Sequence, residues 1–220
     1  MIRKEAFVMI FKALKAAALA AVGGLVLATA AVAAVDPKNP DWPCVQKKVE
    51  NLSVMAIWDG PPLDDHKDWF RAEKIPALVT KLASRRVPME KATAAIDAFA
   101  ASIPESERDA QLSKLFYGLF DTVNNQRRGI INGIEKYQRS QKARAEELEK
   151  QGVDIAKLRG DLVVDDTSTV PESEEEQKLY WAGRIFQERQ ANIPIACELP
   201  AVLEERLFEL SRHIRSKMSK

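Results

Sequence analysis

Two cysteines, Cys44 and Cys197, offer the clearest chemistry in this 220-residue chain, which contains no others. In an oxidising compartment they would form a disulfide closing a loop of about 153 residues, worth about 5 kcal/mol in chain-entropy models. Pro43, Pro194 and Pro200 stiffen the backbone around them. The alternative, a redox or metal-binding thiol pair, lacks the C-x-x-C spacing and a nearby histidine. We therefore predict a structural disulfide.

The other reactive residue types do not combine into a recognisable site. Nucleophilic hydrolysis needs a base beside a nucleophile, but the chain has two histidines, His66 and His213, and no G-x-S-x-G segment. His66 lies in the acidic stretch 59–68, which lacks the spacing and glycine of an EF-hand loop. Glu-x-x-His pairs and phosphate-binding glycine loops are also missing from the sequence. We predict a solvated loop at 59–68, and no enzyme active site, metal or cofactor.

The first 34 residues indicate where the protein works. Arg3 and Lys4 precede an apolar stretch that ends in small residues, which is the pattern of a signal peptide cleaved near residue 34. We therefore expect export to a Gram-negative-type periplasm. An uncleaved anchor that tethers the protein to the membrane is the alternative, because about 20 mostly apolar residues can span a bilayer. The glycine pair at 23–24 favours cleavage, since glycine weakens a helix.

Charge and composition exclude one class of partner and favour one fold class. The 33 basic and 32 acidic residues include four and one, respectively, within 1–34, so the remaining chain has a net charge of −2. This balance gives no electrostatic footprint for nucleic acid. The remainder is long enough for one domain with a core. Its abundant Ala, Leu, Glu, Lys and Arg are typical of helical proteins.

Residues 35–75 are predicted to form an irregular arm rich in tryptophan and proline. Trp42, Trp58 and Trp69 lie close together in the sequence. The simplest interpretation is that these large rings pack across the helices. The alternative is a binding arm in which they line a groove for a partner or a glycan. With the acidic stretch around His66, that groove could also serve a ligand or metal sensor.

The helical domain is predicted over 76–220. Short helices are expected over about 76–86 and 88–102, each with a proline in its first turn. Apolar residues then recur every three or four positions from 105 to 152 without a proline, which predicts a helix of about 45 residues. Its expected weak point is 124–129, where amide side chains and glycine lower helix propensity.

A second apolar seam predicts the partner of this long helix. The polar connector is expected over about 152–168, and the seam then runs to residue 193, where Pro194 should end it and Pro200 should start a last helix. We predict an all-α fold: an elongated antiparallel helical hairpin or bundle over about 105–193, coiled-coil-like in its seam, with the shorter helices at its base.

The pattern [ST]-[IV]-P-E-S-E occurs twice, starting at Ser102 and at Thr169. We interpret both copies as capping boxes, in which Ser102 or Thr169 is the N-cap and Glu105 or Glu172 reaches back to it. Duplication would explain the repeat. Convergence on good capping chemistry explains it better, because the match fades further along the chain.

These observations predict an exported, non-catalytic helical protein of the periplasm or envelope. We expect a protein-interaction, assembly or chaperone-like role, with another envelope protein as partner. A periplasmic binding protein that senses a small ligand or a metal is the alternative, and a cryptic enzyme is the third. The basic amphipathic C-terminus, 212–220, allows peripheral membrane contact. The sequence resembles no family closely enough to import a function, and it does not set the oligomeric state.

Overall fold

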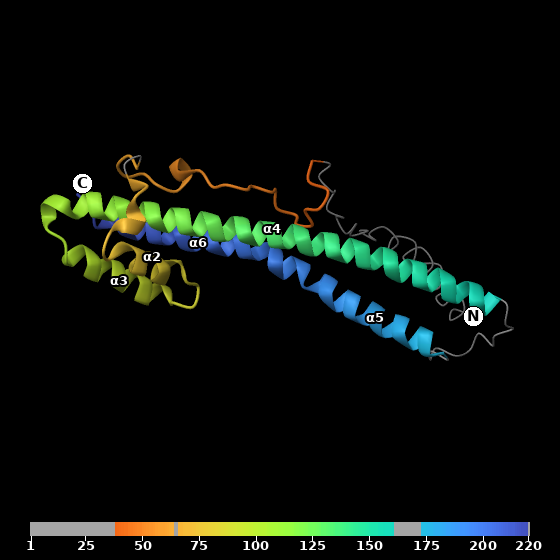
Figure 1. The fold of residues 1–220 in the computed structure, drawn as a ribbon. Coiled ribbons are helices and arrows are strands. Elements are labelled where there is room, and N and C mark those ends of the chain that lie inside the picture. The colour runs from red at the N-terminus through yellow and green to blue at the C-terminus, as the bar shows by residue number, and fades with distance from the viewer. Residues whose placement is uncertain (1–37, 64–65, 161–172, 220) are drawn as a thin grey trace, which may run out of the picture. The chain divides into compact units, whose positions relative to one another are not determined.

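The computed structural model describes residues 38–63, 66–160 and 173–219, and all regular structure within these ranges is helical. The predicted all-α fold is confirmed. The described residues include five α-helices, which Figure 1 labels: α2 (Ile75–Ala83), α3 (Met89–Ala101), α4 (Glu105–Gly160), α5 (Glu174–Ala191) and α6 (Ile193–Ser216). Two short 3-10 turns, η2 (Val54–Ala56) and η4 (Trp69–Arg71), lie in the segment before α2.

The first long helix, α4, has 56 residues and is about 84 Å long at 1.5 Å per residue. It is continuous through the predicted weak point at 124–129 and past residue 152, where we expected the connector to begin. Glycine costs a helix about 1 kcal/mol. Burial of Phe116, Leu119 and Ile131 on one face of α4 offsets that cost.

The second half of the hairpin, which runs back along α4, is divided at Asn192. This residue ends α5 and precedes α6. The predicted helix break at Pro194 is confirmed, because α5 ends at Ala191, but the prediction that Pro200 starts the last helix was wrong. Pro194 lies in the first turn of α6, where its missing N–H costs nothing. Pro200 lies inside α6 and is buried. The disulfide at Cys197 and the packing of Ile193 hold this turn in helical form despite the lost hydrogen bond.

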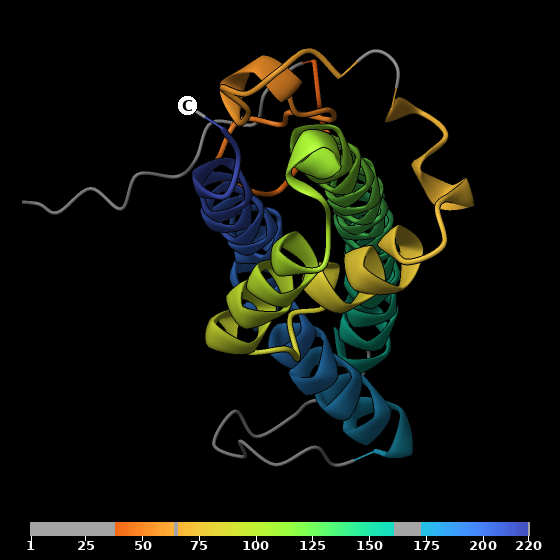
Figure 2. The same ribbon diagram turned by 90° about the vertical axis from the view of Figure 1, so that its left-hand side faces the viewer.

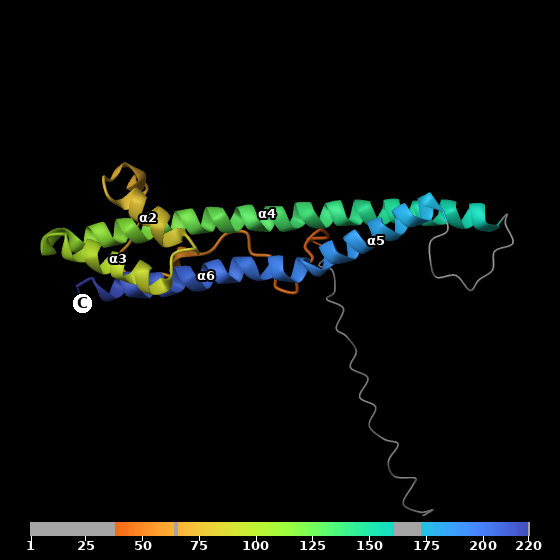
Figure 3. The ribbon, with the colours of Figure 1, turned by 90° about the horizontal axis from the view of Figure 1, so that it is seen from below.

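Helix α4 runs antiparallel to α6 and then to α5, as Figures 1 and 3 show, and it contacts both. Helices α2 and α3 pack beside the first part of α4 and the last part of α6, as seen along the hairpin in Figure 2. The predicted hairpin with shorter helices at its base is therefore confirmed.

Two hydrophobic clusters stabilise the hairpin. The larger cluster joins α2, α3, the first part of α4 and the end of α6, and includes Leu82, Ile96, Phe116 and Leu207. The smaller cluster surrounds the disulfide and contains Trp42, Cys44, Ile131, Ile134, Ile193 and Cys197. Both clusters leave out α5, whose packing against α4 is more open.

The caps differ from the predicted boxes. Ser102 ends α3, and its hydroxyl donates to the Phe99 carbonyl at 2.8 Å. It is not the N-cap of α4, because α4 begins at Glu105, directly after Pro104. The first predicted box was thus wrong: the turn between the helices is so short that Ser102 satisfies the carbonyls of α3 instead.

The capping box of α5 lies later in the chain than we predicted. Ser173 is the N-cap; its hydroxyl accepts from the Glu176 N–H at 3.2 Å, and the Glu176 carboxylate accepts from the Ser173 N–H at 3.3 Å. Thr169 and Glu172 lie outside the described residues. Ser173, the serine within the repeated pattern, caps the helix because a glutamate, Glu176, follows it three residues later.

Candidate functional site

The three tryptophans of the predicted arm are used for packing. Trp58 stacks on Phe116 with ring centroids 4.1 Å apart, and Trp42 and Trp58 are only 9% and 8% exposed. Trp69 is half-buried against α4, where a Cβ on Gly118 would lie 2.7 Å from its ring. The indole N–H groups of Trp42 and Trp58 donate to the Gln46 and Pro61 carbonyls. These rings attach the segment to the helices.

The predicted disulfide pairing is present: Cys44 and Cys197 are joined, with Cα atoms 5.6 Å apart. It fixes residues 38–63, the described first part of the predicted arm, to the start of α6. From here on, the arm means residues 38–63. A hollow of about 190 Å³ lies beside the bond and Trp42. Of the three charged residues on its wall, Lys47, Arg127 and Glu204, the last two bind each other.

Polar residues of α4 hold the same arm. The Arg127 guanidinium donates to the Val49 and Glu50 carbonyls, and Asn124 Oδ1 accepts from the Leu52 N–H at 2.9 Å. Lys48 forms ion pairs with Glu135 at 2.7 Å and with Glu50 at 2.9 Å. These bonds, that to Glu135 first, raise the pKa of Lys48. The segment we expected to weaken α4 is therefore the segment that binds the arm.

The acidic stretch around His66 offers no metal site in the part of the chain that the structure describes. Within that part, no three His, Cys, Asp or Glu side chains are grouped to hold an ion. Asp68 instead forms an ion pair with Lys114 at 3.0 Å, and this hydrogen bond lowers the pKa of Asp68. Asp64 and Asp65 lie outside the described residues.

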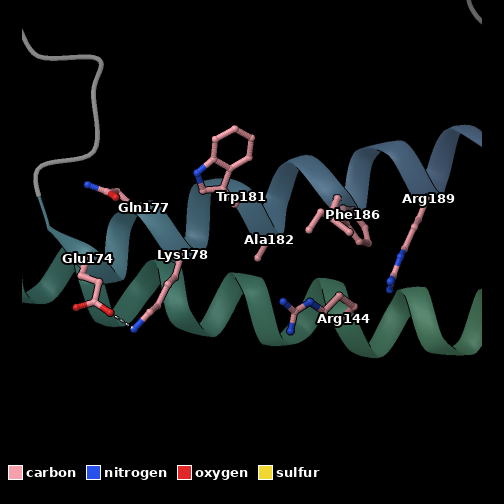
Figure 4. Close-up of a pocket in the computed structure, with 9 residues that line it drawn as sticks. Arg144, Glu174, Gln177, Lys178, Trp181, Ala182, Phe186 and Arg189 are labelled. Carbon is pink, nitrogen blue, oxygen red and sulfur yellow. Dashed lines mark ion pairs between the residues drawn. The ribbon is translucent and has the colours of Figure 1, made fainter.

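Helix α5 carries the most unusual surface of the molecule. It is described over its full length of 18 residues, and none of its side chains is buried. Leu179, Gly183 and Phe186 are half-buried on the side that faces α4. Trp181 is 63% exposed and Ile185 50% exposed. Figure 4 shows Trp181 directed away from α4.

Five exposed residues follow one line along this outer side. At about 100° per residue they lie within about 80° of the helix surface, roughly opposite the side that faces α4. We call this line the α5 stripe; it consists of Glu174, Lys178, Trp181, Ile185 and Glu188. Tyr180 extends its apolar part, because its ring meets that of Trp181 edge to face with centroids 5.4 Å apart.

A groove of about 640 Å³ runs along one flank of the stripe, between α5 and α4. Its apolar wall is formed by Trp181, Ala182, Ile185 and Phe186, and its charged rim by Arg144, Glu174, Lys178 and Arg189 (Figure 4). Glu174 and Lys178 form an ion pair at 2.7 Å, and both side chains remain largely exposed. The groove thus combines an apolar wall with a charged rim of both signs.

Sequence reasoning missed this stripe, although a signal was present. The seam used for the prediction passes through Leu179 and Phe186, which do face α4. Trp181 and Ile185 lie off that seam, so the helix has apolar residues on two sides. A helix that is apolar on a second side has a second surface to cover.

Among the described residues, no helix has the length and apolar character that crossing a membrane requires. Comparison of the chain with models of protein families, with curated proteins and with solved structures found no match in any of the three.

Proposed function

We propose that this protein is exported to the periplasm and binds protein partners of the envelope there, in an assembly or chaperone-like role without catalysis. The observation that carries the proposal is the α5 stripe, on which Trp181 and Ile185 are exposed along a helix without buried side chains. Exposed aromatic and aliphatic side chains that cluster within a polar rim are typical of protein-binding surfaces.

The support behind the stripe favours the same role. Helix α6 is attached to the arm by the disulfide and to α4 by Arg127, and α5 directly precedes α6, with only Asn192 between them. The end of the hairpin that carries α5 thus has a firmly held base. A binding surface on a regular helix is better defined than one on a loop.

Export is supported by two features of the chain. Residues 1–34, which lie outside the described residues, have the sequence pattern of a signal peptide. The disulfide is consistent with an oxidising compartment. In the proposal the leader is cleaved; if it is retained, it tethers the same protein to the membrane.

A ligand or metal sensor gains less support, since Trp42 and Trp58 are packed and the described part of the acidic stretch forms no ion site. An enzyme gains none from the groove, whose wall is apolar and whose rim is charged without a nucleophile and base pair.

Co-purification from cells tests the proposal. The full chain, tagged at its C-terminus, is crosslinked in cells, isolated from soluble and membrane fractions, and weighed by mass spectrometry. We expect a periplasmic protein shortened by about 34 residues that carries a stoichiometric protein partner, and loss of this partner in the double variant Trp181→Ala/Ile185→Ala.

The matched control is Gln187→Ala, an exposed residue of the same helix about 120° around from Trp181. It should retain the partner. Cytoplasmic location, or a partner that the double variant binds as well as the wild type, would contradict the proposal.

A further inference from the structure

The order of charges along the α5 stripe identifies one partner. From its first residue the stripe reads acidic, basic, aromatic, aliphatic, acidic: Glu174, Lys178, Trp181, Ile185, Glu188. All five side chains are exposed. A partner that covers them must bring apolar groups to the middle and opposite charges to both ends.

A second copy of α5 in the antiparallel direction supplies these groups. Both the Trp181/Ile185 pair and the Lys178/Glu188 pair are centred on Gly183. A two-fold axis that crosses the stripe at the level of Gly183 therefore places Trp181 against Ile185 of the second copy, and in the same register Lys178 against Glu188 of the second copy. Each contact occurs twice, as in an isologous interface.

We propose that the partner on the α5 stripe is a second copy of this chain, bound through antiparallel packing of the two α5 helices. This inference rests on the proposed function, because it names one occupant of the surface on which that function depends. It adds a direction, a register and two ion pairs that a general binding surface does not require.

The end charges fix the direction. Glu174 and Glu175 lie in the first turn of α5, and Arg189 lies in its last turn. Antiparallel packing brings the acidic end of one copy to the basic end of the other, and it also opposes the helix dipoles. Parallel packing would face Lys178 with Lys178 and Glu188 with Glu188, which like-charge repulsion disfavours.

The same mixed pattern argues against an acidic or a basic partner. An acidic segment would meet Arg144, Lys178 and Arg189 on the rim of the groove, but also Glu174 and Glu188. A basic segment would meet Glu174 and Glu188, but also the three basic residues of the rim. Only a partner that carries both charges matches Lys178 and Glu188 together, and α5 itself carries both.

The predicted contact is modest in size. Two helices of 18 residues meet over about 27 Å, with one tryptophan and one isoleucine from each copy in the centre. Such an interface lies at the small end of specific contacts, so we expect a dissociation constant on the order of 10 μM.

A charge exchange measured by sedimentation velocity tests the register. The mature full-length protein is studied from about 1 μM to about 500 μM, a range that brackets the expected constant. Lys178→Glu or Glu188→Lys alone should weaken association at least about tenfold, because each places two like-charge pairs in the interface. The double variant Lys178→Glu/Glu188→Lys should restore it to within about threefold.

Two further variants separate interface from fold. Trp181→Ala should weaken association at least about tenfold, and Gln187→Glu should leave it unchanged. No variant should change the midpoint of thermal unfolding by more than about 2 °C, since α5 buries no side chain. A monomer over the whole range, or a dimer that Trp181→Ala leaves intact, overturns the inference, and so does failure of the double variant to restore association.

Failure of the dimer can be distinguished from failure of the proposed binding function. If the purified protein stays monomeric while a different protein co-purifies from cells in a manner that depends on Trp181, the dimer is wrong and the binding role stands. If neither a dimer nor a stripe-dependent partner is found, both are wrong.

Discussion

Arg127 of α4 is paired with Glu204 of α6 while the same guanidinium donates to the backbone of the arm. The Arg127 side chain is 5% exposed, so it is charged within the protein interior. One residue therefore joins three segments that are far apart in sequence: the arm, α4 and α6. Together with the disulfide, this arrangement holds the middle of the hairpin.

Arg127→Met tests this relationship. The change removes the buried donor and leaves the Val49 carbonyl without that partner, so we expect a loss of about 2–3 kcal/mol in the free energy of unfolding, measured by urea denaturation. The neighbouring Arg128 is exposed, and Arg128→Met should cost no more than about 0.5 kcal/mol. Equal losses for the two variants would show that Arg127 does not join the segments as described.

Removing the disulfide should loosen the arm. We expect Cys44→Ser/Cys197→Ser to lose about 2–5 kcal/mol of unfolding free energy and to exchange the amide hydrogens of residues 45–52 faster than the wild type. Hydrogen exchange with mass readout measures this locally. The protected amides of α2 and α3 provide the internal control, because their packing lies in the larger cluster. Unchanged exchange in the arm would mean that Arg127 and Asn124 alone hold it.

Two helical glycines should respond in opposite ways to alanine. A Cβ on Gly118 would lie 2.7 Å from the Trp69 ring, so Gly118→Ala should displace the ring and cost about 1–3 kcal/mol. Around Gly133 no atom lies within 4 Å of the added Cβ, and Gly133→Ala should stabilise the protein by about 0.5–1 kcal/mol through helix propensity. Thermal and urea unfolding measure both. Stabilisation by both changes would refute the packing of Trp69 on α4.

Acid should weaken the contact between α3 and the end of α6. The Asp97 carboxylate oxygen Oδ1 lies 2.9 Å from Lys217 Nζ and 2.7 Å from His213 Nε2. Both bonds lower the pKa of Asp97, and the bond from Lys217 has the larger effect. A carboxyl with a lowered folded pKa adds stability above its unfolded pKa, about 3.9 for aspartate. That stability is lost as the pH falls through the folded value.

The variant Asp97→Asn isolates this effect. The difference in unfolding free energy between wild type and variant should be at its full value above about pH 5 and should shrink steadily as the pH falls below about 3.9. Urea denaturation at each pH measures it. Asp41, whose pKa is lowered by its bond to Lys142, remains in both proteins and cancels in the difference. A difference that stays constant with pH would contradict the role of Asp97.

The sequence predicted much of the fold because helix periodicity is a local signal. The apolar spacing from Leu112 to Leu148 indicated the long helix, and two cysteines allowed one pairing. Helix ends were predicted less well. Ser102 and Pro200 each have a strong local preference, and tertiary contacts used them otherwise: Ser102 caps the helix before it, and Pro200 is buried inside α6.

The candidate surface could not be predicted in the same way. Trp42 and Trp58 attracted attention as a cluster, but large rings close together are more often core, and these are. Trp181 lies more than 100 residues after the other three tryptophans, so it is not part of their cluster. Its exposure depends on which side of α5 faces α4, and that is decided by the packing of Leu179 and Phe186.

Photo-crosslinking from position 181 in living cells tests directly whether the α5 stripe binds a partner. A photoreactive amino acid replaces Trp181 in one strain and Gln187 in another, and the crosslinked protein is recovered and identified by mass spectrometry. We predict a discrete crosslinked protein in the periplasm from position 181 and little or no crosslinked protein from position 187. Absence of a crosslinked protein at 181, or the same diffuse set from both positions, would contradict a binding role for the α5 stripe.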